Sequence, residues 1–243
     1  IYENPCQMCF KCESRNRLAR NSQMTIDVRE RIQAELFDYQ TLVDALGELS
    51  FPRDKITDLI RKRIIIRIKK GLYIFGDRYR RHPYSRELLA NLIYGPSYVS
   101  LDYALDFYGF IPERSEALTS VTLRRSRKFR TPAGLFIYRQ IPVQAYQAGM
   151  VRAEGDNGQA FLIASPEKAL ADKIISERGV AFTSPTGMRQ YLIESLRIDI
   201  SNIQSLSLER IDEYAGRYRS RKLRHLGGLV RRLQKSNEGI PYE

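Results

Sequence analysis

The chain lacks the long apolar run that a membrane-spanning helix needs, because no stretch of it approaches roughly 18 consecutive apolar residues. It also lacks the charged segment followed by an apolar segment that marks a secretory signal peptide. We therefore expect a cytoplasmic protein without a membrane partner.

The common catalytic motifs are missing too: the sequence contains no P-loop, no G-x-G-x-x-G, no H-E-x-x-H and no G-x-S-x-G. Only two histidines are present, and no carboxylates cluster, so acid–base chemistry has few candidates. We assign Ser165 to the cap of a helix that begins at Pro166, and not to a catalytic pair with Lys168. We expect no enzyme, no catalytic residue and no cofactor. The less favoured alternative is a nucleic-acid-processing enzyme whose scattered acids meet in space.

Cysteine is scarce, and all three cysteines lie in one short run: Cys6, Cys9 and Cys12. Thiolates at this spacing can bind zinc or an iron–sulfur cluster. A complete site usually needs four ligands, and His82 and His225 are far away in the sequence. We therefore expect no metal, with the three cysteines as the weaker alternative. Residues 1–23 show no helical or strand period, and we interpret them as an N-terminal arm that is non-native or loosely attached.

Positive charge is what the chain has in excess, with a formal net charge of +12. Such a balance favours a polyanionic partner such as nucleic acid, an anionic membrane surface or an acidic protein. The bases are concentrated in residues 53–81, which hold eleven Lys or Arg against three acids, and in residues 210–235, which hold nine against two. A third cluster, RRSRKFR, occupies residues 124–130.

The first concentration lies in a segment where three helices and a hairpin are expected. Apolar spacing and caps predict helices over residues 25–37, 39–46 and 52–63, with Gly47 ending the second and Pro52 in the first turn of the third. Residues 63–76, RIIIRIKKGLYIFG, predict a hairpin that turns at Lys70-Gly71. Because alternate side chains of a strand point to the same side, we expect Ile64, Ile66 and Ile68 to anchor the hairpin to the third helix.

This order of elements is typical of a winged helix-turn-helix, in which the third helix enters the major groove of DNA. The hairpin tip would then lie along the phosphate backbone, where Lys and Arg release counterions. The alternative is a basic helix–hairpin that binds only protein. The predicted contacts to double-stranded DNA are Arg53, Lys55, Thr57, Arg61, Lys62, Arg67, Lys69 and Lys70. Asp58 on the same face counts slightly against DNA, although such a residue can accept from a cytosine amino group.

The segment LVDALGELSFPRDKITDLIRKRIIIRIKKGLYIF resembles the N-terminal domain of the AbiEi antitoxins, the repressor–antitoxins of an abortive-infection, type IV toxin–antitoxin system. GPSYVSLDYALDFYGFIPE (95–113) and FLIASPEKALADKI (161–174) are similar to two later segments of that family. Together these matches span about residues 25–175.

The resemblance implies two functions. The N-terminal domain would repress its own operon by binding inverted repeats in the promoter, and the C-terminal domain would counter a nucleotidyltransferase-like toxin without forming a stable complex. The alternative is a winged-helix transcriptional regulator whose C-terminal domain has a different, non-toxin partner. We expect an α+β protein: a winged helix-turn-helix domain (24–80), a linker helix (81–97) and an α+β antitoxin domain with a small sheet followed by helices (98–243).

In the C-terminal domain, strands are predicted over residues 117–123, 135–140 and 159–164, and helices dominate from about 186 to 235. Residues 217–235 predict an amphipathic surface helix, which we favour over a polyanion-binding one. The 124–130 cluster indicates either a solvated hairpin end or a second polyanion-binding patch, for instance for RNA bound by the toxin. The residues of that patch are Arg124, Arg125, Arg127, Lys128 and Arg130.

Overall fold

The computed structural model describes residues 28–47, 51–155, 158–177 and 184–237, and it shows a mixed α+β protein with two sheets. The chain divides into two compact units, the first ending at Tyr84 and the second beginning at Ser85. The N-terminal arm and its three cysteines lie outside the described residues. No helix in the described ranges is long and apolar enough to cross a membrane.

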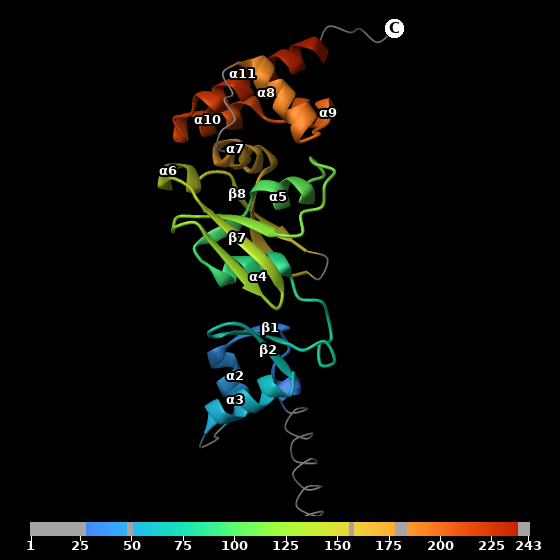
Figure 1. The fold of residues 1–243 in the computed structure, drawn as a ribbon, viewed down its shortest axis with the longest axis vertical. Coiled ribbons are helices and arrows are strands. Elements are labelled where there is room, and N and C mark those ends of the chain that lie inside the picture. The colour runs from blue at the N-terminus through green and yellow to red at the C-terminus, as the bar shows by residue number, and fades with distance from the viewer. Residues whose placement is uncertain (1–27, 48–50, 156–157, 178–183, 238–243) are drawn as a thin grey trace, which may run out of the picture. The chain divides into compact units, whose positions relative to one another are not determined.

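In the part of the first unit that the structure describes, two complete helices accompany a three-stranded antiparallel sheet (Figure 1). Residues 28–31 are also helical. The sheet has the order β1-β3-β2, so the hairpin is extended on one side by a short strand from earlier in the chain. In chain order the elements are β1 (Leu36–Asp38), α2 (Tyr39–Leu46), α3 (Pro52–Arg61), β2 (Ile65–Lys69) and β3 (Leu72–Phe75).

Local signals fix the starts of α2 and α3, the end of α2 and the hairpin turn where the sequence predicts them, whereas α3 ends at Arg61, two residues before its predicted end. The Asp38 side chain accepts from the backbone N–H of Thr41 and caps α2, and Gly47 ends that helix with a φ of 71°. Pro52 lies in the first turn of α3, where its missing N–H costs no hydrogen bond. Gly71 has a φ of 83° in the β2–β3 turn, which a residue with a Cβ would strain to adopt.

The helix predicted over residues 25–37 is wrong in its second half. Helical structure ends at residue 31, and Leu36 and Phe37 belong to β1, opposite Ile74 and Tyr73 of β3. The Glu35 carboxylate, only 3% exposed, binds the Arg29 guanidinium and accepts from the backbone N–H groups of Arg81 and His82. The spacing of apolar residues in a short run cannot distinguish a helix from a strand. Here the pairing with β3 and the buried ion pair favour the strand.

The predicted anchoring of the hairpin also needs correction. Ile64 and Ile65 lie in the core cluster with Leu59 of α3, whereas Ile66 and Ile68 do not belong to that cluster. Ile65 is fully buried, although the expected inward side of Ile64, Ile66 and Ile68 would place it on the opposite side of the strand. The period-two expectation started one residue too early, because β2 begins at Ile65 and a bulge shifts its register between Arg67 and Lys69.

The second unit is built on a six-stranded mixed sheet of order β6-β7-β5-β4-β9-β8. Three of its strands match the predictions: β5 (Leu118–Thr122), β7 (Gly134–Gln140) and β9 (Ala160–Ala164). The other three were not predicted, so the sheet is larger than the small one expected: β4 (Ser97–Val99), β6 (Arg127–Thr131) and β8 (Met150–Glu154).

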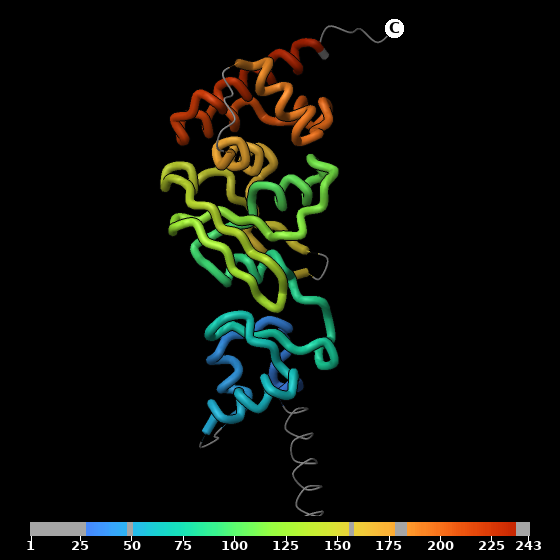
Figure 2. The backbone as a smooth tube through the Cα atoms, viewed as in Figure 1, coloured from blue at the N-terminus to red at the C-terminus, as the bar shows by residue number. Residues whose placement is uncertain are grey.

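Helices lie on both faces of this sheet (Figures 1 and 2). α4 (Arg86–Ile93), expected as a linker, packs on β4 and β9, and α5 (Leu101–Phe107) and α7 (Pro166–Ser176) lie on the opposite face. α7 also contacts the C-terminal helices and so joins them to the sheet. The remaining helices are α6 (Val143–Tyr146), α8 (Pro185–Gln190), a π-helical turn (Tyr191–Ser195), α9 (Ile200–Gln204), α10 (Leu208–Arg217) and α11 (Arg221–Asn237).

The predicted apolar face of the last helix is used for packing within the unit. Leu223, Leu226, Leu229 and Val230 of α11 are all buried. A Cβ at Gly227 would lie 2.9 Å from the end of the exposed Asp212 side chain, which can move aside, and at ordinary contact distance from Ile211 and Leu208 of α10.

Candidate nucleic-acid interface

The predicted DNA-contacting residues do not form one uniform surface, because the structure divides them into two groups. Arg53 and Thr57 of α3 and Arg67 and Lys70 of the hairpin line one groove in the first unit. Lys55, Arg61 and Lys62 instead surround a carboxylate on α3. The eighth residue, Lys69, is exposed at the end of β2.

The groove lies between α3 and the tip of the β2–β3 hairpin. Its floor is apolar, formed by Ile56 and Ile60 of α3 and Tyr73 of β3. The N–H of Tyr39, the first residue of α2, donates to the Gly71 carbonyl at 3.1 Å and ties the hairpin turn to the helices. The groove therefore has basic residues over an apolar floor, and no acidic side chain is among those that line it.

The hydroxyl of Thr57 is already used as a donor within α3. Its hydroxyl donates to the Arg53 carbonyl at 2.9 Å, one turn earlier in α3. The hydroxyl oxygen keeps its acceptor capacity, so Thr57 can still accept from a ligand. Arg53 is exposed and is the one basic residue of α3 that lines the groove.

Asp58 organises the second group of bases. Its carboxylate lies 2.7 Å from the Lys62 ammonium, 2.6 Å from the Arg61 guanidinium and 3.9 Å from the Lys55 ammonium. The hydrogen bond from Lys62 holds the pKa of Asp58 below its usual value, and Arg61 acts in the same direction. The carboxylate therefore stays charged at neutral pH and reduces the positive charge that these three side chains can offer a polyanion.

Sequence reasoning missed Tyr39 as a groove residue. Its spacing with Leu42, Val43 and Leu46 placed it on the buried face of α2, yet it is 37% exposed and lines the groove. The signal that could have found it is the cap: because Asp38 starts the helix, Tyr39 lies in the first turn, at the end of the apolar stripe and next to the hairpin turn.

The basic cluster at residues 124–130 forms an edge of the sheet in the second unit. Arg127, Lys128 and Arg130 lie on β6, which pairs only with β7 among the described strands, and Arg124 and Arg125 precede it. Arg124 lies over the Tyr94 ring and Arg127 over the Phe129 ring, with centroid distances of 5.7 and 5.5 Å. None of the ion pairs found in the described ranges involves these five bases, and all five are exposed.

Ser165 is confirmed as the cap of α7, since its side chain accepts from the Lys168 backbone N–H. Its own hydroxyl donates to Glu167. Lys168 is fully buried, and its ammonium binds the Asp172 carboxylate and the Tyr218 hydroxyl, the latter at 3.0 Å. Burial lowers the pKa of Lys168, while Asp172 raises it. These partners account for both side chains as parts of the packing of α7.

Comparison with known proteins adds no relative, since no protein-family model and no curated protein matches this chain.

Proposed function

We propose that the chain is a DNA-binding transcriptional autorepressor, with its first unit acting as a winged helix-turn-helix. In this proposal α3 enters the major groove and the β2–β3 hairpin is the wing beside the phosphate backbone. The observation that carries it is the groove that brings Arg53, Arg67 and Lys70 together over Ile56 and Tyr73. Cations from a helix and a hairpin tip converge here without an intervening carboxylate.

The charge distribution supports DNA over a protein partner. A protein-binding helix–hairpin would be expected to present apolar anchors, and the groove instead places its apolar residues beneath a basic rim. DNA binding uses exposed cations that release counterions from phosphate, which Arg53, Arg67 and Lys70 are placed to do.

For the second unit, residues 85–243, we propose the antitoxin role that the AbiEi resemblance implies: it counters a nucleotidyltransferase-like toxin without a stable complex. The support is the resemblance of residues 95–113 and 161–174. Both segments form a strand followed by a helix, and in the second segment Ser165 caps the helix. The alternative is a regulator whose second unit has a non-toxin partner. A toxin gene directly beside this one in the genome separates the two.

The test of DNA binding is fluorescence anisotropy with the protein's own promoter DNA and with a scrambled duplex of the same length. We expect the double variant Arg67→Ala/Lys70→Ala to bind promoter DNA at least tenfold more weakly at about 100 mM salt, since it loses two phosphate contacts. Arg189→Ala is the matched control, because it removes an exposed arginine from α8 in the other unit. Equal affinities for the double variant and the control would contradict the proposal.

A further inference from the structure

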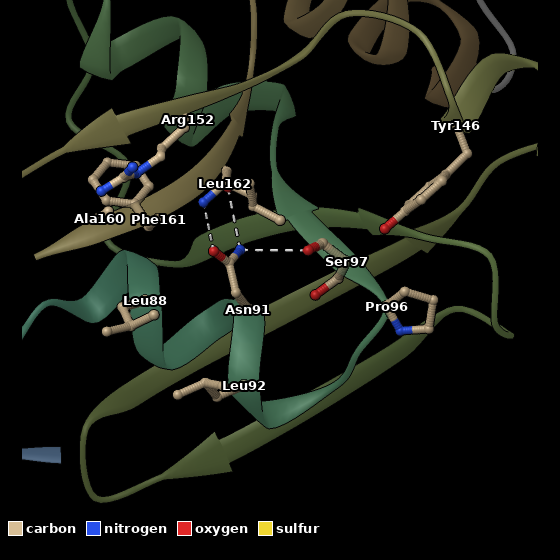
Figure 3. A pocket seen from close by; sticks show the side chains of 10 residues that line it. All are labelled: Leu88, Asn91, Leu92, Pro96, Ser97, Tyr146, Arg152, Ala160, Phe161 and Leu162. Atoms are coloured by element: carbon tan, nitrogen blue, oxygen red, sulfur yellow. Dashed lines mark hydrogen bonds between the residues drawn. The ribbon is translucent and has the colours of Figure 1, made fainter. Parts of the chain in front are cut away.

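The second unit contains a pocket that the proposed DNA-binding and antitoxin functions do not use. It is bounded by α4, the start of β4, the strands β8 and β9, and Tyr146 of α6 (Figure 3). Its walls are mostly apolar, and they include Leu88, Leu92, Pro96, Phe161 and Leu162.

The framework of the pocket is fixed by Asn91 of α4. Its amide oxygen accepts from the Leu162 N–H at 2.7 Å, and its amide nitrogen donates to the Leu162 carbonyl at 3.2 Å (Figure 3). The same nitrogen lies 3.5 Å from the Ser97 carbonyl. The Asn91 side chain thus joins β4 to β9. These two strands are paired in the sheet at Val99 and Ile163. A wall held by hydrogen bonds to two strands is formed before any ligand arrives.

Two leucines leave apolar surface open in this pocket. Leu92 of α4 is 45% exposed and Leu162 of β9 is 38% exposed. The residues on either side of each leucine are buried or hydrogen-bonded, which holds the backbone of Leu92 and Leu162 in place at the pocket. Removing this surface from water is favourable by about 25 cal/mol per Å², which an apolar ligand would gain on binding.

The polar groups at the pocket match one kind of ligand. Arg152 of β8 is the one charged residue among those that line it, and its contact with Glu154 is 3.5 Å long between two largely exposed side chains, so it is weak. The Ser97 hydroxyl is buried and has no hydrogen-bond partner among the described residues. Burial raises the pKa of Tyr146, so its hydroxyl, directed toward Ser97 in Figure 3, stays a neutral donor.

We propose that this pocket binds a small amphipathic carboxylate, with its apolar body against Leu92 and Leu162 and its charged end at Arg152. A charge-assisted hydrogen bond from a guanidinium to a carboxylate is stronger than one between neutral groups. The apolar walls exclude water from the apolar part of the ligand. The inference does not rest on the proposed function, because every residue in it belongs to the second unit and none is among the residues that line the α3 groove.

The test is a titration of the ¹⁵N-labelled full chain with sodium octanoate and, separately, with 1-octanol, followed by NMR. The Leu162 backbone amide and the Asn91 side-chain amide report on the pocket, and Val143 and Ile200 report on exposed apolar residues elsewhere in the same unit. We expect saturable shifts at Leu162 and Asn91 with octanoate and affinity for octanol about tenfold lower. Shifts that do not saturate, or that are equally large at Val143 and Ile200, would show nonspecific partitioning and overturn the proposal.

Two matched pairs of variants separate the parts of the site. Arg152→Gln should weaken octanoate about tenfold and leave octanol within twofold, whereas Arg139→Gln, an exposed arginine on β7, should change neither. Leu162→Gln should weaken both probes, and Val143→Gln neither. If Leu162→Gln lowers stability, Leu92→Gln makes the same test from the helix side. Equal binding of octanoate by Arg152→Gln and the unmodified protein would refute the assigned anion contact.

Discussion

Asp58 is the residue whose role differs most between sequence and structure. The sequence shows an acid on an otherwise basic helix face, and the structure shows that it holds Arg61 and Lys62 by close contacts. Under the proposed DNA-binding function, Asp58 limits nonspecific DNA binding, because it neutralises bases that would otherwise meet phosphate.

We therefore predict that Asp58→Asn strengthens binding to scrambled DNA severalfold and steepens its salt dependence, at a cost of roughly 0.3–0.5 kcal/mol of stability per lost helix pair. Anisotropy titrations at several salt concentrations measure the first effect and urea unfolding the second. Weaker binding restricted to promoter DNA would mean that Asp58 itself accepts from a base, which is the alternative role of such a carboxylate.

Lys168 is also held by a carboxylate, but in the core of the second unit. Its ammonium is fully buried between Asp172 and the rings of Tyr98 and Tyr218, and Asp172 also accepts from the Ser100 hydroxyl at 2.7 Å. A buried pair of this kind contributes little net stability, but removing one partner leaves the other charge without compensation.

Lys168→Met should therefore destabilise the second unit by roughly 3–5 kcal/mol in urea unfolding. The double variant Lys168→Met/Asp172→Asn should recover a large part of that loss, because asparagine is neutral and can still accept from Ser100. If the double variant were less stable than the single one, the loss would come from the shape of the side chain and not from an uncompensated carboxylate.

At the scale of elements, predictions succeeded where the determining signal is local. Pro52 and Ser165 mark helix starts through a fixed φ and a cap, and Gly47 and Gly71 mark a helix end and a turn through their positive φ. These signals depend on a few neighbouring residues and can be recognised without knowledge of the fold.

The elements that sequence reasoning missed are set by partners distant in the chain. β6, with the sequence RKFRT, has no apolar alternation, and it is a strand because the turn at 132–133 pairs it with β7. β1 forms because β3 offers it an edge. For the candidate interface, the bases were predictable from composition, but their division by Asp58 and the placement of Tyr39 in the groove require coordinates.

The α3–hairpin arrangement predicts two separable contributions to DNA binding. Lys69→Ala/Lys70→Ala should weaken binding to every duplex and reduce the slope of log K against log salt by about 2, since each lysine is assigned one phosphate. Arg53→Ala should instead change which promoter sequence is preferred, by about 1–3 kcal/mol at one base pair. Titrations of single-base promoter variants measure both effects. If the hairpin and α3 variants acted alike, the assigned roles would be wrong.

At the scale of the whole molecule, the bases belong to two units with different surroundings. The α3 groove lies in the first unit, and the exposed bases of β6 lie in the second, beside Tyr94 and Phe129. Arginine on an edge strand also has a simpler role, which is to prevent the edge from pairing with another chain. Charge reversal separates these roles, because glutamate protects an edge as well as arginine does but repels a polyanion.

We predict that changing Arg124, Arg125, Arg127 and Lys128 to Glu abolishes rescue from the cognate toxin and leaves promoter binding within about twofold, since these bases and the α3 groove belong to different units. The four changes also remove two cation–π contacts, each worth about 0.5–1 kcal/mol at an exposed site, so urea unfolding must show that the unit stays folded. Arg67→Ala/Lys70→Ala should give the converse result, with promoter binding lost and rescue kept. Rescue that survives the reversal in a folded protein would assign β6 to edge protection alone, and a joint loss of both functions in either variant would mean that one surface serves both.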